Sequence, residues 1–180
     1  GALVTMTGAL GHMVDAPINS DDESATPWGV SSWAPMKPIA EQRAPLTDDP
    51  ATMARHIKET AYFLRADMVG ICKLPPYTVF THSKHNGDPV ELNHKYAIGI
   101  LIDQDWRTGS AFNGHDWISN SMSFLSYSTS GFIACVLADY IRRLGYPARA
   151  HHAMNYQVVV PPILLMAGLG EMCRIGDVVL

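Results

Sequence analysis

The stretch SFLSYSTSGFIACVLADYIRRLG, residues 123–145, predicts the longest element of the fold. Apolar residues recur along it at helical spacing, so we expect one helix over residues 118–144, about 40 Å long at ~1.5 Å per residue. Ser119 or Asn120 would cap its free N–H groups. The basic pair Arg142–Arg143 suits the negative end of the helix dipole, and Gly145 suits the position after its end.

Residues three and four apart share a face of this predicted helix. One face is made of small residues around a single phenol: Ser119, Ser123, Tyr127, Ser130, Gly131, Ala134 and Ala138. The opposite face is apolar, and we expect it to be core: Met122, Leu125, Phe132, Val136, Leu137, Ile141 and Leu144. The small residues favour either close helix packing, with Tyr127 bonded to a backbone carbonyl, or the approach of a large flat ligand.

The remaining elements predict a layered α+β or α/β domain. Residues 51–66 have the spacing of an amphipathic helix. β-branched and apolar runs predict strands at 68–74, 95–103 and 156–160, and a further strand begins in GDVVL at the end of the chain. Residues 105–115 are expected to form a polar loop, and a short apolar helix should follow Pro161 and Pro162.

The composition limits the class of protein and divides the chain near residue 50. Among 180 residues, 47% are hydrophobic and 17% charged, and the net charge of −4 without a basic stripe disfavours nucleic acid as a partner. We find no apolar run that approaches a bilayer span. Residues 1–50 are predicted to be either an extended arm or a solvated linker, rich in Pro, Asp and Ser, and residues 51–180 the core. Trp28 and Trp33 would anchor the arm on the core or on a second copy of the chain in a homodimer.

Three widely spaced cysteines, Cys72, Cys135 and Cys173, argue against a disulfide framework and for a reducing compartment. We expect all three to be buried apolar residues. The turn GLGE, Gly168 to Glu171, has a different character, because its two glycines permit positive φ and a close approach of the backbone to a ligand.

Four segments carry a resemblance to a known family: RADMVGICKL, SYSTSGFIACVLADYIRRLGYPARA, MNYQVVVPP and AGLGEMCR. They resemble corrinoid-dependent reductive dehalogenases, most of all the cytoplasmic, catabolic branch that acts on halogenated phenols. The resemblance implies an α+β, nitroreductase-like cobalamin-binding domain of which the C-terminal part is missing. It also implies reductive dehalogenation of phenol-type aromatic compounds with cob(I)alamin.

The resemblance assigns roles residue by residue. Tyr127 matches the proton-donating tyrosine of the family, and Ser123 matches a position in the substrate pocket. Asn155 matches an asparagine near the corrin and the substrate. The cofactor-approaching turn of the family matches Gly168, Leu169, Gly170 and Glu171.

Two family features have no counterpart before Leu180. The family places a Lys or Arg downstream, where it would stabilise the tyrosine phenolate. It also holds two [4Fe–4S] clusters through cysteine runs of a kind that this sequence lacks. We therefore expect a fragment of a larger enzyme, with electrons supplied by another protein or domain.

Other functions remain open from the sequence. A non-catalytic corrinoid-binding or chaperone module would need the fold and the glycine turn alone, and epoxyqueuosine reductases share the architecture. A flavin nitroreductase relative is disfavoured because no basic phosphate-binding set is evident. A zinc site among the histidines is also disfavoured, because HxxH in a loop lacks a compact third ligand; these histidines are His82, His85, His94, His151 and His152.

Overall fold

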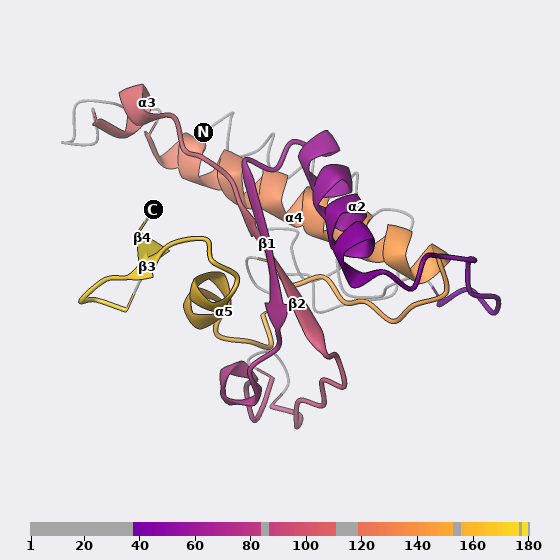
Figure 1. Cartoon of the computed structure of the whole chain (residues 1–180). Coiled ribbons are helices and arrows are strands. Elements are labelled where there is room, and N and C mark those ends of the chain that lie inside the picture. Colours follow the sequence, from indigo (N-terminus) through magenta and orange to yellow (C-terminus); the bar gives the residue numbers. More distant parts are fainter. Residues whose placement is uncertain (1–37, 84–86, 111–118, 153–155, 177, 180) are drawn as a thin grey trace, which may run out of the picture.

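The structure is a computed structural model that describes residues 38–83, 87–110, 119–152, 156–176 and 178–179. Helices and strands are mixed along the chain (Figure 1). Their order is α2 (Pro50–Phe63), β1 (Met68–Lys73), the 3₁₀ helix η2 (Pro76–Thr78), β2 (Tyr96–Leu101), α3 (Trp106–Ser110), α4 (Ser119–Arg143), α5 (Val160–Met166), β3 (Glu171–Met172) and β4 (Val178–Val179).

Strands β1 and β2 form an antiparallel pair that divides the described core into two sides. Side chains alternate across a strand, so neighbouring residues face opposite sides. Val69 packs in the cluster shared with α2 and α4, whereas Cys72 packs with Ile163 of α5. This antiparallel pair, which we call the hairpin, therefore carries α2 and α4 on one side and α5 on the other.

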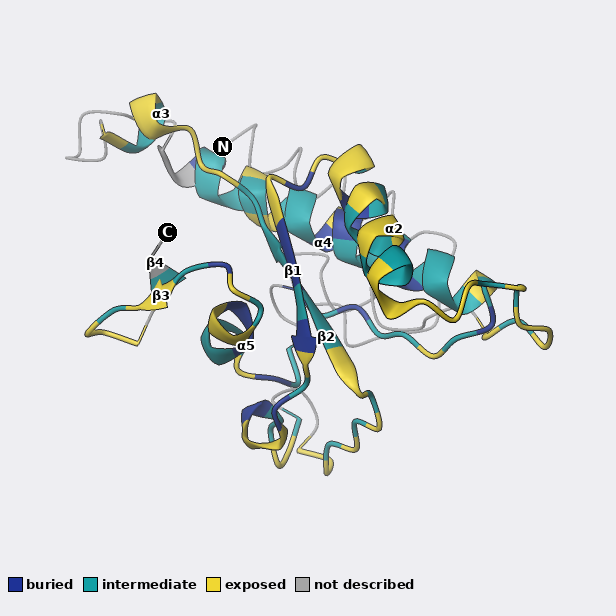
Figure 2. Ribbon diagram, viewed as in Figure 1, coloured by how far each residue is buried: buried dark blue, intermediate teal, exposed yellow. Residues whose placement is uncertain are grey.

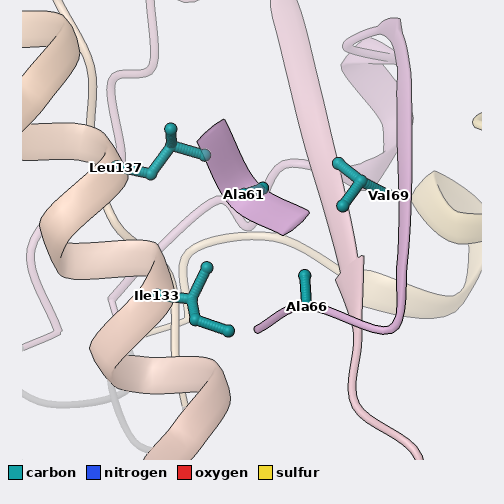
Figure 3. Packing of buried hydrophobic residues seen from close by; sticks show 5 residues of the cluster. All are labelled: Ala61, Ala66, Val69, Ile133 and Leu137. Atoms are coloured by element: carbon teal, nitrogen blue, oxygen red, sulfur yellow. The ribbon is translucent and has the colours of Figure 1, made fainter. Parts of the chain in front are cut away.

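A cluster of buried apolar side chains lies between the hairpin and helices α2 and α4 (Figure 3). Ile133 and Leu137 of α4 meet Ala61 of α2, with Ala66 and Val69 beside them. Ala61 and Ile133 have no exposed surface. Burying such side chains supplies the main favourable free energy of folding, so this contact fixes α4 on the hairpin.

The predicted bounds of the long helix are close to those observed, but its predicted core face is wrong in part. Leu125 is 50% exposed and Phe132 is 41% exposed, whereas Ile133, absent from both predicted faces, is fully buried. The small-residue face is also divided, because Ala138 is buried and Tyr127 is exposed. Apolar residues occur on more than one face of this helix, so their spacing alone could not select the face that meets α2. Much of α4 is only intermediate in burial (Figure 2).

The run at 156–160 is not a strand. Val158 forms an isolated bridge with Val79, and the chain turns into α5 at Val160. Pro161 and Pro162 explain this, because proline has no N–H for a strand ladder and is favoured in the first helical turn. The predicted polar loop at 105–115 likewise contains the short helix α3.

Helix α4 corrects the prediction that no apolar run approaches a bilayer span. Its segment Ser121–Arg143 is long and apolar enough to cross a membrane by length and composition. The same segment contributes Ile133 and Leu137 to the cluster with α2 and β1, and a core helix passes the same test. Length and composition therefore do not distinguish a membrane-spanning helix from a core helix.

The described part of the predicted arm lies against the C-terminal end of α4. The N–H of Ala40 donates to the carbonyl of Arg142, and that of Ala44 donates to the carbonyl of Leu144, both at 3.0 Å. Gly145 has φ +87°, and a Cβ there would lie 2.7 Å from the Cα of Arg43. The glycine predicted after the helix is thus required by both its conformation and its neighbour. Trp28 and Trp33 lie outside the described residues.

Candidate functional site

The N-terminal half of α4 presents Tyr127 at the surface. Its side chain is 52% exposed, and among the described residues its hydroxyl makes no hydrogen bond. The carbonyl of Tyr127 accepts a bond from the Ser130 hydroxyl at 3.0 Å, and Ser123 and Ser130 are half-buried. No carbonyl of the described residues therefore holds the phenol, and the choice between the packing and ligand interpretations of Tyr127 stays a prediction.

Tyr156 is a second phenol near Tyr127 that sequence reasoning missed. Burial, and after it the electrostatic influence of Tyr127, raises the pKa of Tyr156. Its place next to Asn155 in the MNYQ segment was visible, but its proximity to α4 depends on the tertiary fold. Asn155 itself lies outside the described residues.

The Gly168–Glu171 turn has the backbone conformation expected of its glycines. Gly168 has φ +73° and Gly170 has φ +154°, values that side chains of L-residues rarely allow. The N–H groups of Gly168 and Leu169 donate to the carbonyls of Leu165 and Leu164, both at 3.0 Å. Leu169 is only 5% exposed, and Glu171 opens β3 as an exposed residue.

The predicted site residues therefore belong to two separate structural elements. Ser123 and Tyr127 are carried by α4, whereas residues 168–171 follow α5 on the opposite side of the hairpin. Among the described residues, no hydrogen bond joins Tyr127 to the turn. Their joint use in one site remains a prediction.

A polar cavity lies near the other end of α4. Its volume is about 550 Å³, and its lining includes Glu91, His94, Arg142, Arg149 and Gln157. Burial, followed by the positive charges of Arg149 and Arg142, lowers the pKa of His94. Arg142 is about four helical turns from Tyr127, or ~22 Å along the axis, so the two places are separate.

His151 lies beside this cavity as a neutral acceptor. Its Nδ1 accepts a hydrogen bond from the N–H of Gln157 and another from Nη1 of Arg149, both at 3.2 Å. Two donors at Nδ1 leave the proton on Nε2. Burial, then the charges of Arg149, His94 and His152, lowers the pKa of His151 to about 3. The His151 ring therefore links the side chain of Arg149 to the backbone of Gln157.

The cysteines only partly follow the prediction. Cys72 is buried, and burial raises the pKa of its thiol, whereas Cys135 and Cys173 are half-buried; all three are free. Within the described ranges, no group of three His, Cys, Asp or Glu residues is placed to hold a metal ion.

Known structures share both sequence and fold with this chain. The catabolic reductive dehalogenase NpRdhA is 34% identical over 96% of the chain, with a TM-score of 0.75. The same enzyme in complex with 3-bromo-4-hydroxybenzoic acid is 33% identical, with a TM-score of 0.76 and the same coverage. A reductive dehalogenase described with a mechanism for B12-dependent dehalogenation is 39% identical over 79% of the chain, with a TM-score of 0.72.

The match is to a part of these enzymes. The chain covers 23% of the two NpRdhA chains and 21% of the third protein. No family model and no curated protein matches the chain. Over the segment that it spans, this chain is therefore homologous to the B12-dependent reductive dehalogenases, which confirms the resemblance predicted from its sequence.

Proposed function

We propose that this chain forms part of a corrinoid-dependent reductive dehalogenase that acts on halogenated phenol-type compounds, with Tyr127 as the proton donor. The observation that supports this most is the exposed Tyr127 on a helix of a chain 33–39% identical to reductive dehalogenases. One of those relatives is in complex with a brominated hydroxybenzoic acid, which motivates the proposed substrate class.

The residues present suit a large planar cofactor. Ser123 and Ser130 are half-buried residues one turn on either side of Tyr127, and their small side chains allow a flat ring to approach the helix. In the turn, a Cβ at Gly168 would have no atom within 4 Å, so that glycine borders open space. When bound, reduced cobalamin would supply the electrons for reductive removal of halide. We propose that the cofactor site is lined by Ser123, Asn155 and the Gly168–Glu171 turn.

The reaction balances with one proton from the protein. The carbon–halogen bond breaks and halide leaves, two electrons enter from a reductant outside this chain, and a C–H bond forms at the same carbon. We propose that the Tyr127 hydroxyl delivers that proton and is reprotonated from solvent. A positioned proton donor typically contributes about 10²- to 10⁴-fold. A cation beside the phenol would stabilise its phenolate, and the family resemblance implies one from a later part of the enzyme.

The test uses the full-length protein loaded with cobalamin, a low-potential chemical reductant and a bromophenol. Bromide release and the cobalt-to-protein ratio are measured together. We expect bromide release that requires cobalamin, and in D₂O one deuterium at the carbon that lost bromine. A protein that retains cobalt in full but releases no bromide would point instead to the non-catalytic corrinoid-binding module.

A further inference from the structure

We propose that Gly70 and Gly99 are positioning residues that set the place of the Gly168–Glu171 turn, and thereby the affinity for the corrinoid. The inference rests on the proposed function, because it assumes that the turn lines the cofactor site. The two glycines come from different strands but are direct partners in the register of β1 and β2. Together they form a patch without side chains on the α5 side of the hairpin.

Gly70 is in closest contact with the turn. A Cβ at this position would lie 2.5 Å from the carbonyl oxygen of Ala167 and 2.8 Å from both the Cβ of Ala167 and the Cγ of Leu169. The nearest of these atoms belongs to the backbone, so a rotamer change could not relieve the clash. An added methyl group must displace the start of the turn or the strand.

Gly99 lies against the same segment, but its nearest neighbours are side-chain atoms and not backbone atoms. Its Cβ would lie 2.9 Å from Cδ2 of Leu164 and 3.1 Å from Cδ1 of Leu169. Both are the ends of flexible side chains, which can move by rotation about their χ angles. Substitution of Gly99 should therefore disturb the turn less than substitution of Gly70.

The residues around this patch show how closely α5 lies on the sheet. Two positions along β1, the thiol of Cys72 contacts the carbonyl oxygen of Ile163 at 3.7 Å. Leu169 packs over the glycine pair and is 5% exposed, although its neighbours Gly168 and Gly170 have positive φ. The buried side chain of Leu169 therefore sets the distance between the turn and the sheet. That distance is short because Gly70 and Gly99 have no side chains.

The experiment compares Gly70→Ala and Gly99→Ala in the full-length protein with Gly109→Ala as the matched control. A Cβ at Gly109 would meet only Cε of Met122, at 4.0 Å, which is ordinary contact. Cobalamin affinity is measured by the change in corrin absorption on titration of the cofactor-free protein. Amide hydrogen exchange of Gly168 and Leu169, whose N–H groups are hydrogen-bonded, reports the turn without the cofactor.

For Gly70→Ala we expect about a tenfold loss of cobalamin affinity and about tenfold faster exchange at the two turn amides. Gly99→Ala should give changes of about threefold in both measurements, and Gly109→Ala should change neither. Exchange at Ile133 should stay as in the wild type, since the cluster with α2 lies on the other side of the hairpin. If Gly70→Ala does not fold, the inference is tested by the exchange and affinity changes of Gly99→Ala.

Unchanged turn exchange in the sheet variants would overturn the inference, as would faster exchange with unchanged cobalamin affinity. Failure of the proposed function looks different: the wild type would either bind no cobalamin, or bind it and release no bromide. The exchange measurement would still show whether the glycine pair seats the turn.

Discussion

The two halves of α4 differ both in composition and in what surrounds them, because the N-terminal half is rich in serine and the C-terminal half in apolar residues. The C-terminal half is held by the core through Ile133 and Leu137, and Tyr140 is hydrogen-bonded to Nε2 of His56 on α2 at 2.7 Å. The N-terminal half leaves Leu125 and Tyr127 about half exposed. The apolar half of the helix therefore packs in the core, whereas the serine-rich half leaves large side chains accessible to a ligand or another segment.

The largest expected effect contrasts a tyrosine from each half. Tyr127→Phe should slow bromophenol turnover by about 10²- to 10⁴-fold with cobalt content unchanged, because only the proposed donor hydroxyl is lost. Tyr140→Phe removes a hydroxyl from the other half, where it bonds His56, and should leave turnover near the wild-type rate. Turnover and cobalt are assayed in parallel. Near-wild-type turnover by Tyr127→Phe would refute the proposal that Tyr127 is the proton donor.

The next contrast concerns stability. Ile133→Ala should lower the free energy of unfolding by about 2–5 kcal/mol, because it leaves a cavity in a fully buried position. Leu125→Ala removes a side chain that is 50% exposed and should cost less than about 1 kcal/mol. Denaturant unfolding of the two variants checks this. Equal losses would mean that the N-terminal half is as well packed in solution as the C-terminal half.

The end signals of the long helix could be predicted, and its orientation could not. Gly145 predicted that the long helix ends at residue 144, one residue beyond the observed end of α4 at Arg143, and the observed φ of +87° at Gly145 explains why glycine stands there. The burial of Ile133 depends on Ala61, a residue far away in the sequence. The glycine at position 168 permitted either positive φ or a close backbone approach, and the structure has φ +73° there.

Where local patterns conflict, tertiary contacts decide. The run before Pro161 has the composition of a strand, but the two prolines begin a helix there. The proximity of Tyr156 to Tyr127 has no local signal, because the two residues are far apart in the sequence. The cross-strand pairing of Gly70 and Gly99 likewise becomes visible only from the register.

A smaller, pH-dependent effect is expected from the segment that follows the anchored half of α4. The folded pKa of His151 is about 3, below the usual value of 6.5, so the unfolded chain binds a proton that the folded chain does not. The free energy of unfolding should therefore fall as the pH drops below ~6.5, by at most about 1.4 kcal/mol per pH unit for this group. His151→Gln keeps an acceptor for the N–H of Gln157 and should flatten that slope. Parallel pH profiles of the two proteins, from denaturant unfolding between pH 7 and 5, would contradict this.

We propose that the exposed half of α4 faces a corrinoid and its substrate. The decisive measurement is a crystal structure of the full-length protein with cobalamin and a bromophenol. We predict that the corrin lies against the face that carries Ser123 and Tyr127, with the Gly168–Glu171 turn at its edge and the phenol of Tyr127 directed at the halogenated carbon. A structure in which residues 123–134 are packed wholly against protein, with the cofactor bound elsewhere, would rule this arrangement out.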